Sequence, residues 1–536
     1  MRSGHSAEIP IPYNQLIDIF RFLLVSLNIE VILQESTAYR RRERLRKIPD
    51  ALGLEGVYGA TIERIKAQDG DKSRLGMGAL MWISHAERLL TADDLCNALA
   101  IELGSTDFNT SNIPSITTLA NCCQGLITVN KEASAVRLIH FTLKDYLSAH
   151  PDIFSGPHAV MGEICLTYLN SQQVKALSAD PSAKPILGTT GLLRGKPFLK
   201  YCSLYWGVHA KRELSNCARS LALELLREYD GHISAAILLK LECLSELDLD
   251  EDLEFDSSGS FSGLHCASFF GIFEIVAALI ETGCYNLNRG DFRGYTPLAW
   301  AAEKGHEEVV KLLLGREEVN PDIPEEHGRT PFMFAALRGH ERVAKILLGR
   351  DEVNPNKPDK YGQTPLLVAA WGGYIEVVKM LLGREEVNPG EPDVSNQTPL
   401  LVAARGGHEE VVKILLGREE IDPDKPDNSG GTPLSWAAWY GDERVVGMLL
   451  GREEAKPDKP DKFGRTPLSY AAEVGRGRVV KMLLGREEVD PNKSDDDGRT
   501  PLSYAVGRGH VGIVKIFAER EEVNPDKPDY GGRTPP

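Results

Sequence analysis

The sequence predicts a mainly helical protein whose second half is a solenoid of stacked helix pairs and whose first half is helical without a repeat. Two observations carry this prediction. The dipeptide Thr-Pro recurs every 34 residues, at positions 296, 330, 364, 398, 432, 466, 500 and 534. Glycines and prolines divide each interval into two short helices and a loop. A fixed period indicates one supersecondary unit stacked many times, because such a unit cannot bury its apolar face alone.

The first helix of each unit is specified by its opening residues. In the unit that begins at Tyr361, Gly362 can adopt a positive φ in a tight turn. Thr364 is a favourable helix N-cap, and Pro365 suits the first helical position, where a missing N–H costs nothing. We expect a short helix that ends at Gly373. Its apolar face is predicted to comprise Leu366, Ala369 and Ala370.

The second helix of the unit has a broader apolar face. We predict that this face comprises Val377, Val378, Met380, Leu381 and Leu382. Gly383 and the following "NPGEPD" stretch end the helix, because proline cannot continue it. The unit is therefore a turn, a short helix, a turn, a longer helix and a projecting loop.

The repeated residues resemble ankyrin repeats. The strings "GYTPLAWAAEKGHEEVVKLLL" from Gly294 and "NQTPLLVAARGGHEEVVKILL" from Asn396 carry this resemblance. The usual ankyrin unit has about 33 residues, and the extra residue falls in the loop "VNPDKPD". Tetratricopeptide repeats share the observed period, but their tryptophan, leucine-glycine and tyrosine positions are not met. The resemblance implies an ankyrin solenoid of eight complete helix pairs and a ninth that stops at "GRTPP". In the first unit, from Phe261, Ser262-Gly263 replaces Thr-Pro.

Composition limits the classes of function. The net charge is −16 and the isoelectric point about 5.4, which disfavours non-specific binding to nucleic acid or anionic membranes. The 9 cysteines have no regular spacing, and we expect buried, reduced thiols. The most apolar stretch, from Leu16, contains Asp18, Arg21 and Glu30 and is too charged to span a bilayer. We therefore expect a soluble intracellular protein, cytoplasmic with the nucleus not excluded.

The first half contains the layout of a winged helix. An amphipathic helix is predicted from Ser73 through "ERLL" at Leu90, and Thr91 opens a second helix with Asp94 completing a capping box. A third helix begins after Pro114, and the β-rich runs "LITV" and "AVRLIHF" follow it. The arginine-rich segment "TAYRRRERLRKIPDAL" is interpreted as a basic helix with a solvated face.

This succession resembles the region that follows the NACHT nucleotide-binding module in fungal NLR-like proteins. The strings "ALMWISHAERLLTADDLCNALAIE", "CCQGLITV" and "VRLIHFTLKDYLSAHPDIF" carry the likeness. "YGATIERI" resembles the end of the NACHT module, and "PFLKYCSLYWGVHA" the helical connector. The resemblance divides the chain into a NACHT-like remnant at 1–72, a winged-helix-like segment at 73–155, a helical connector or N-terminal cap at 156–255 and ankyrin repeats at 256–536.

One departure from the NACHT pattern is a missing Walker A loop. The nearest string is "GDKS" from Gly70, in which Asp71 separates the glycine from Lys72. No nucleotide-binding residue and no cofactor is therefore carried over. The resemblance implies an NLR-like protein without the front of its switch, either by evolution or by truncation of the gene model. It also implies ligand sensing in non-self recognition or innate defence.

The sequence offers no catalytic or metal-binding motif. It contains no G-x-S-x-G, H-E-x-x-H or cysteine–histidine signature. Histidines recur at equivalent repeat positions, too far apart to share one ion, so we interpret them as bracing the loops through hydrogen bonds. They are His306, His340, His408 and His510. Acidic hairpins such as "SDDDGRT" lack EF-hand spacing and are interpreted as solvated tips. We expect a protein that is not an enzyme and binds no metal.

Comparison of the repeats indicates a binding surface. The second-helix pattern "VVK-LL-GREEV" barely changes, whereas the two residues after each Ala-Ala pair, such as Glu303-Lys304, change freely. In ankyrin proteins these positions face the concave surface, and the hairpin tips also vary. Aromatic and arginine side chains are favoured at protein interfaces. The predicted partner-binding residues are Arg338, Tyr361, Trp371, Arg405, Trp439, Tyr440 and Phe463.

The leading hypothesis is an interaction protein whose concave ankyrin face binds a protein ligand. Replacing Trp439 by alanine is expected to weaken binding by about 2 kcal/mol and to change thermal unfolding little. The last full unit has Ile513, Val514, Ile516 and Phe517 without a polar cap, which predicts fraying or self-association from about residue 500. Two alternatives remain open: an NTP-dependent switch with a missing or upstream P-loop, and a winged-helix DNA-binding regulator.

Overall fold

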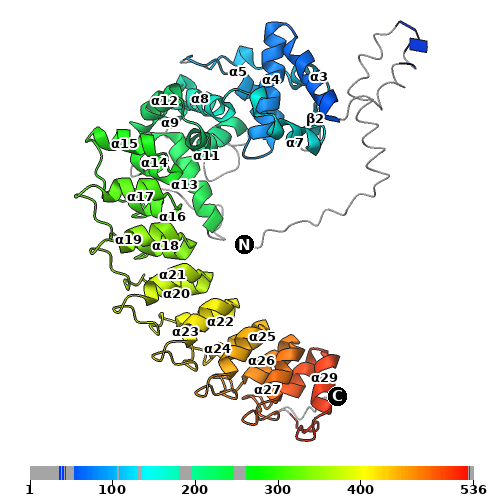
Figure 1. The fold of residues 1–536 in the computed structure, drawn as a ribbon, viewed down its shortest axis with the longest axis vertical. Helices are drawn as coiled ribbons and strands as arrows, with labels where there is room; N and C mark the ends of the chain where they lie inside the picture. Colours follow the sequence, from blue (N-terminus) through cyan, green and yellow to red (C-terminus); the bar gives the residue numbers. More distant parts are fainter. Residues whose placement is uncertain are drawn as a thin grey trace. The chain divides into compact units, whose positions relative to one another are not determined.

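The computed structural model divides into two compact units, Met1–Gly263 and Leu264–Pro536, and each is described by itself (Figure 1). The residues that it describes are 36–37, 39–40, 43, 54–105, 108–130, 132, 134–179, 196–246, 261–528 and 530. The apolar stretch from Leu16, most of the arginine-rich segment and the incomplete ninth repeat lie outside these residues. The expected fold class, a helical region with a winged helix followed by a solenoid of helix pairs, is confirmed.

The winged helix of the first unit has one strand more than the sequence predicted. Its elements are α4 (Gly70–His85), β1 (Leu90–Thr91), α5 (Ala92–Ala100), α6 (Ile116–Cys122), β2 (Ile127–Asn130) and β3 (Ala135–Leu138). The strands form an antiparallel sheet in the order β1-β3-β2, with Leu90 opposite Val136 and Ile127 opposite Leu138. The prediction of a helix as far as Leu90 was wrong, because pairing with a strand distant in sequence overrides the local helical pattern.

The turn between β1 and α5 is held by a buried carboxylate. The predicted capping box is confirmed, since Thr91 Oγ1 accepts from the Asp94 N–H at 3.1 Å and Asp94 accepts from the Thr91 N–H at 2.9 Å. Arg88 donates to the same carboxylate at 2.8 Å. Asp94 is fully buried, and these partners compensate for its lost hydration.

Further helices complete the first unit. They are α3 (Leu54–Lys66), η1 (Thr110–Asn112), α7 (Phe141–Ala149), η2 (Pro151–Ile153), α8 (Pro157–Asn170), α9 (Gln172–Ala179), α11 (Pro197–Arg212), α12 (Asn216–Leu226), η4 (Tyr229–Gly231) and α13 (Ile233–Glu246). Helix α11 packs against α5, α8 and α13. Its Phe198 and Tyr201 meet Trp82 of α4 edge-on, with ring centroids 5.8 and 5.6 Å apart. This aromatic core joins the winged helix to the helices that follow it.

The second unit is a stack of eight helix pairs within residues 261–528 (Figure 1). The first helices are α14 (Gly263–Phe270), α16 (Pro297–Glu303), α18 (Pro331–Arg338), α20 (Pro365–Gly372), α22 (Pro399–Gly406), α24 (Pro433–Tyr440), α26 (Pro467–Val474) and α28 (Pro501–Gly507). The second helices are α15 (Phe273–Glu281), α17 (Glu307–Leu314), α19 (Glu341–Leu348), α21 (Ile375–Leu382), α23 (Glu409–Leu416), α25 (Glu443–Leu450), α27 (Gly477–Leu484) and α29 (Val511–Ala518). Each pair packs against the next, so the array has one continuous core.

The signals at both ends of the first helix act as predicted. Thr364 Oγ1 accepts from the Leu367 N–H at 3.2 Å, and Pro365 occupies the first turn. Gly373 ends α20 with φ 71°, and a Cβ there would lie 2.5 Å from Nδ1 of His408. Glycine is therefore required at this position for its conformation and for its size.

The burial of the helices differs from the prediction. Helix α20 is buried on every side along its first six residues, because it packs against α18, α21 and α22. A single apolar face comprising Leu366, Ala369 and Ala370 was thus too narrow an expectation. In α21 the four predicted valines and leucines are buried, but Met380 is only half-buried.

The recurring histidines brace one repeat against the preceding one, which confirms their structural interpretation. Each histidine donates its Nε2–H to a backbone carbonyl of the previous first helix, because a carbonyl oxygen can only accept. The pairs are His306–Phe269 at 2.8 Å, His340–Glu303 at 2.9 Å, His408–Trp371 at 2.9 Å and His510–Glu473 at 3.0 Å. Where arginine replaces histidine, Arg476 Nε donates to the Trp439 carbonyl at 3.2 Å.

The "NPDKPD" loops form a second set of bonds between repeats. Lys357 donates to the carbonyl of Asp322 at 2.7 Å and to its carboxylate at 2.9 Å. Lys493 makes the same two bonds to Asp458, and Lys459 donates to the Asp424 carbonyl at 2.7 Å. The residues that lengthen the ankyrin-like unit therefore bind neighbouring loops together.

The cysteines and the irregular first repeat also have a structural explanation. The expectation of buried thiols is correct for six of the described cysteines but wrong for Cys217 and Cys284, which are exposed. At Gly263, a Cβ would collide with the carbonyl oxygen of Leu226, so the Pro of the usual Thr-Pro cannot stand there. Within the described residues, none of the helices has the length and apolar character needed to cross a membrane.

Candidate protein-binding surface

The hairpins between the helix pairs are fixed by an acidic residue at a constant position. In the hairpin before α26, the Asp461 carboxylate accepts from the backbone N–H groups of Phe463 and Arg465 at 2.9 and 2.8 Å. Neighbouring hairpins also bond to each other, since the Lys462 N–H donates to the Ser429 carbonyl at 3.0 Å. The hairpin tips are thus presented by a hydrogen-bonded backbone.

This arrangement corrects the interpretation of the acidic hairpins as solvated tips. In "SDDDGRT", Asp495 is only 4% exposed and accepts from the N–H groups of Asp497 and Arg499. Asp496 and Asp497 are exposed. The first acidic residue therefore closes the turn, and only the two after it face water.

The same carboxylate holds an aromatic ring of the following first helix in several repeats. Trp436 Nε1 donates to Asp427 at 2.9 Å, and the Tyr470 hydroxyl donates to Asp461 at 2.6 Å. The Tyr504 hydroxyl donates to Asp495 at 2.6 Å. Burial, followed by Asp461, raises the pKa of Tyr470, so its hydroxyl keeps the proton that it donates. These bonds fix each hairpin to the helix beside it.

Arginine and aromatic side chains of three successive repeats make a continuous cluster. The Arg405 guanidinium lies 5.9 Å from the Trp436 ring, and the Trp439 ring meets Tyr470 edge-on at 5.6 Å. The Arg465 guanidinium lies over Tyr470 at 4.6 Å and over Phe463 at 5.2 Å. We name this set the aromatic–arginine cluster; its residues are Arg405, Trp436, Trp439, Phe463, Arg465 and Tyr470.

The predicted site residues differ in how far solvent reaches them. Trp371, Tyr440 and Phe463 are 54%, 51% and 57% exposed, which leaves their rings free to contact a partner. Trp439 is half-buried against Tyr470 of the next repeat. The expectation that its replacement by alanine barely changes stability is therefore withdrawn, because an aromatic pair contributes about 0.5–1.5 kcal/mol beyond its buried area.

The structure brings Arg405, Trp439 and Phe463 together but places Arg338 and Tyr361 elsewhere. Arg338 pairs with Glu303 at 2.7 Å, and Tyr361 stacks on His327 with ring centroids 6.2 Å apart. Glu303 is 3% exposed, so the variable position after the Ala-Ala pair is not on the surface in that repeat. The ion pair with Arg338 accompanies this exception.

Sequence reasoning missed Trp436, Arg465 and Tyr470, although a signal for two of them exists. An acidic residue of the hairpin precedes an indole or phenol by nine positions wherever the bond forms. The pairs are Asp291–Trp300, Asp427–Trp436, Asp461–Tyr470 and Asp495–Tyr504. In the repeats of α20 and α22 the equivalent positions are Val368 and Val402, so the pattern distinguishes the repeats that carry this contact.

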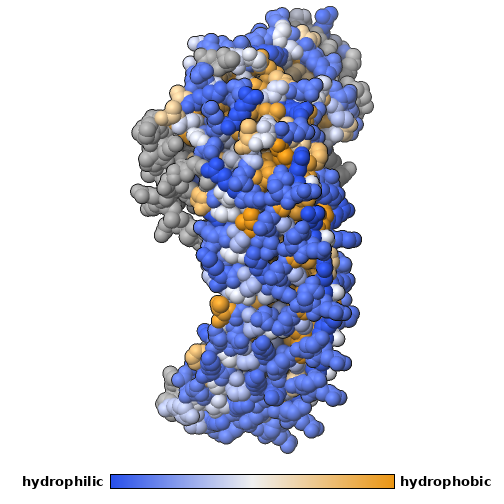
Figure 2. Space-filling model, turned by 90° about the vertical axis from the view of Figure 1, so that its left-hand side faces the viewer, coloured by the Kyte–Doolittle hydropathy of each residue, from blue (hydrophilic) through white to orange (hydrophobic). Residues whose placement is uncertain are grey.

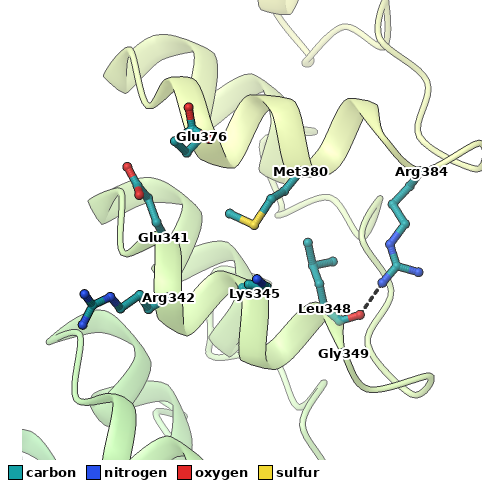
Figure 3. A pocket seen from close by; sticks show the side chains of 8 residues that line it. All are labelled: Glu341, Arg342, Lys345, Leu348, Gly349, Glu376, Met380 and Arg384. Atoms are coloured by element: carbon teal, nitrogen blue, oxygen red, sulfur yellow. Dashed lines mark hydrogen bonds between the residues drawn. The ribbon is translucent and has the colours of Figure 1, made fainter.

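The second helices present a different kind of surface. A shallow groove of about 450 Å³ runs between α19 and α21. Glu341 and Glu376 lie on its two sides, and Met380 reaches into it (Figure 3). Glu376 is paired with Lys379 at 2.8 Å. A similar groove of about 490 Å³ between α23 and α25 has Glu409, Lys413 and Arg444 on its walls. Both grooves are lined mainly by charged side chains.

Figure 2 shows one side of the molecule. Over the later repeats, in the lower half of that view, the surface is largely hydrophilic with scattered hydrophobic residues. Exposed ion pairs between second helices fit this character, among them Arg478–Glu443 at 3.2 Å. The aromatic–arginine cluster is therefore chemically distinct from the charged second-helix surface.

Comparison with known families agrees with this architecture. Residues 232–325, 316–393, 385–461 and 448–529 match the family model for ankyrin repeats (3 copies). Residues 64–155 match the model for the winged helix domain of GPI inositol-deacylase. A search of curated proteins found no match. The first ankyrin match begins at 232, within the segment 156–255 that we assigned to the connector. The ankyrin matches span 232–529, more than half of the 536 residues, and the chain belongs to the ankyrin repeat family.

Proposed function

We propose that the ankyrin array binds a protein ligand through the ends of its first helices and its hairpin tips, the concave face of ankyrin proteins. The observation that carries this proposal is the aromatic–arginine cluster. It places exposed Phe463 beside Arg465 on a hairpin whose backbone is fixed by Asp461. Aromatic and arginine side chains supply most interface hot spots, and a rigid support lowers the entropy lost on binding.

The variation between repeats supports selective binding. The second helices keep the same apolar residues in nearly every repeat, whereas the position after the Ala-Ala pair of the first helix carries Trp371, Arg405 or Trp439. A scaffold that is constant in its core and variable on one surface can recognise a particular partner without changing its fold. We propose that binding of this kind, rather than catalysis, is the role of the chain.

The test compares two exposed aromatic residues of the proposed binding surface with a half-buried methionine on the second-helix surface. A ligand is first identified by affinity capture with the full chain, and its affinity is then measured by calorimetry. The double variant Tyr440→Ala/Phe463→Ala should weaken binding by about 2 kcal/mol or more, roughly 30-fold in Kd. Met448→Ala, on the second-helix surface, is the matched control and should bind like the parent chain. The reverse pattern would place the binding site on the second helices.

We further propose that the chain is the ligand-sensing part of an NLR-like protein of non-self recognition. The order of a winged helix followed by helices and an ankyrin array supports this proposal, as does the sequence resemblance to fungal NACHT proteins. Ligand binding to the array should then change hydrogen exchange in the first unit. If hydrogen exchange in α4 to α8 stays unchanged at saturating ligand, the array binds its ligand without signalling to the first unit, and the sensing proposal fails.

The winged helix is not proposed as a DNA reader. The third helix of such a domain normally enters the major groove, and α6 exposes Thr117 and Asn121 but contains no lysine or arginine. Without basic residues the helix lacks the charge that draws a protein to phosphate. Arg137, on β3, is an exposed basic residue of the nearby hairpin.

We also propose that the last described helix pair associates with a second copy of the chain. Val511 of α29 is 64% exposed, whereas Ile513 and Phe517 are buried. Val514 is only half-buried, although its equivalent in α27, Val480, is fully buried. Sedimentation should show a concentration-dependent dimer that Val511→Lys abolishes. A parent chain that remains monomeric at every concentration would refute this proposal.

A further inference from the structure

Three side chains of the first unit bring metal-binding atoms together from three different segments. They are Glu87, in the turn after α4, His158, in the first turn of α8, and His209, in the last turn of α11. One ligand atom from each lies within 4.8 Å of the other two. The Nδ1 atoms of His158 and His209 are 2.9 Å apart, close enough for one N–H to donate to the other ring.

The surroundings hold His209 in one orientation. Its side chain is fully buried, with the Tyr201 ring stacked at 6.0 Å and the Trp82 ring edge-on at 6.5 Å. Its Nε2 lies 2.9 Å from the Tyr201 hydroxyl. If Nε2–H donates to that hydroxyl, Nδ1 presents its lone pair toward His158. A hydrogen bond on the far nitrogen is what fixes the tautomer of metal-binding histidines.

The carboxylate of Glu87 is oriented in the same manner. Arg212 forms a bidentate ion pair with it, with one of the two contacts at 3.1 Å. A carboxylate has about four lone-pair positions, so it can keep this pair and still bind a cation. Glu213 lies close by and accepts from the Ala159 N–H at 3.2 Å. The charged groups beside the two imidazoles are thus Arg212, Glu87 and Glu213, and the His85 ring also lies 5.6 Å from that of His158.

We propose that Glu87, His158 and His209 bind a divalent transition-metal ion, Zn²⁺ by the chemistry of the donor set. Two imidazoles and one carboxylate are a ligand set that zinc accepts, with a fourth position left for water. The ion replaces the proton shared by the two Nδ1 atoms, and the rings move apart by a few tenths of an ångström to admit it.

The position of the ligands indicates what the ion does. Glu87 belongs to the winged helix matched at 64–155, whereas α8 and α11 follow that domain. A bound ion therefore cross-links the winged helix to α8 and α11, at the edge of the core around Trp82. This role is independent of the proposed ligand-binding function of the array.

A second group of metal-binding residue types serves as a built-in comparison. Glu325, Glu326 and His327 also bring their ligand atoms within 4.8 Å of one another. There the Glu325 carboxylate closes the hairpin by accepting from the Arg329 N–H at 3.1 Å, and it also contacts His327 Nδ1 at 3.0 Å. These contacts are those of the other hairpins, so the fold accounts for this group.

The experiment uses the full chain after treatment with a chelator. Zn²⁺ titrated by calorimetry should bind with a stoichiometry of about one and raise the melting temperature of the first unit. Co²⁺ should give the visible bands of a four-coordinate nitrogen–oxygen site without thiolate charge-transfer absorption. X-ray absorption of the zinc form should show two imidazoles in the first shell.

Variants locate the site. His158→Gln, at a half-buried position, should weaken Zn²⁺ binding more than about 100-fold, since even outer partners of a metal site contribute about 10–100-fold. Tyr201→Phe keeps the ring packing and should weaken binding by about 10–100-fold. His327→Gln is the matched control and should leave affinity unchanged. If His158→Gln fails to fold, Glu87→Gln takes its place and should show the same loss.

The proposal fails on any of three results. The first is the absence of detectable Zn²⁺ binding to the parent chain. The second is Zn²⁺ binding to the Glu87 and His158 variants as tight as that to the parent chain. Thiolate absorption in the Co²⁺ form would instead assign the ion to cysteines. Each result is read directly from the titration or the spectrum, because neither measurement depends on an activity of the protein.

Discussion

Each of the two units is stabilised internally by a different kind of contact. In the array, the same bond recurs from repeat to repeat, as with His340 to Glu303 and His408 to Trp371, both 37 residues apart. The first unit instead has a single aromatic core, formed by Trp82, Phe198, Tyr201 and His209. Trp82 and Phe198 are more than a hundred residues apart in the sequence. A contact that is repeated can be lost in one place, whereas a contact made once supports the whole unit.

The largest expected effect is the loss of the aromatic core of the first unit. Trp82→Ala should destabilise that unit by about 3–5 kcal/mol, because it leaves a cavity among buried rings. Hydrogen exchange should show α4, α8 and α11 opening while the array keeps its protection. The exposed Trp371→Ala is the control and should change stability by less than about 0.5 kcal/mol. A uniform loss of protection in both units would contradict the difference between them.

Acid should lower the free energy of unfolding of the first unit by about 3 kcal/mol more than that of the array. Burial lowers the pKa of His232, in the first unit, to about 4, and that of His265, in the array, to about 4. Below the ordinary histidine value of 6.5 the unfolded chain takes up a proton that the folded ring refuses. Stability is therefore lost as pH falls from about 6.5 to 4, by up to about 3 kcal/mol for each ring.

The array contains a group of the opposite sign. Burial raises the pKa of Asp291 from 3.8 to about 6, so the folded array takes up a proton before the unfolded chain does. As pH falls from about 6 to 3.8, Asp291 stabilises the array by up to about 3 kcal/mol. This gain offsets the stability that the array loses through His265. On acidification the first unit should unfold first, measured by the near-UV and far-UV transitions at pH 7 and pH 4.5. A lower acid stability of the array would reverse this assignment.

Removing one N-cap of the array should cost about 1 kcal/mol and should cost the same in different repeats. Thr398→Ala and Thr466→Ala each delete a side chain that accepts from the third N–H of its helix, at 3.2 Å in both cases. Chemical denaturation measures each cost. Costs that differ by more than about 1 kcal/mol would show that the repeats are not equivalent. The first cause to examine would then be Ser469, whose hydroxyl accepts a second bond from the Thr466 N–H at 3.4 Å.

The smallest expected effect comes from the second-helix surface. Arg478 pairs with Glu443 of the previous repeat at 3.2 Å, and Arg342 with Glu307 at 3.4 Å. At the equivalent junction of α19 and α21, Glu376 stands in place of the arginine and pairs instead with Lys379 of its own helix at 2.8 Å. Glu376→Arg can pair with Glu341 but loses the pair with Lys379, so the stability of the array should change by less than about 0.5 kcal/mol in chemical denaturation, and salt should diminish the change. A larger change at low salt would show that one of these exposed ion pairs contributes more than such pairs normally do.

Much of the array was predictable from the sequence, whereas the binding cluster was predictable only in part. Thr364, Pro365 and Gly373 specify one helix through rules that act over a few residues. The exposed Trp371 and Phe463 follow from variation between repeats. The half-burial of Trp439 does not, because it depends on whether the next repeat carries a ring such as Tyr470 at the facing position.

The sequence by itself determined the helix pairs, their caps and the recurring histidine bonds, because a strict period makes each long-range contact a contact between identical neighbours. Only the tertiary structure decided the pairing of β1 with β3 and the meeting of His158 with His209, which lie 51 residues apart. Each of these contacts joins two segments, and the local sequence of one segment does not predict that it contacts the other. Their geometry is set by the packing of the whole first unit around Trp82, which no local rule describes.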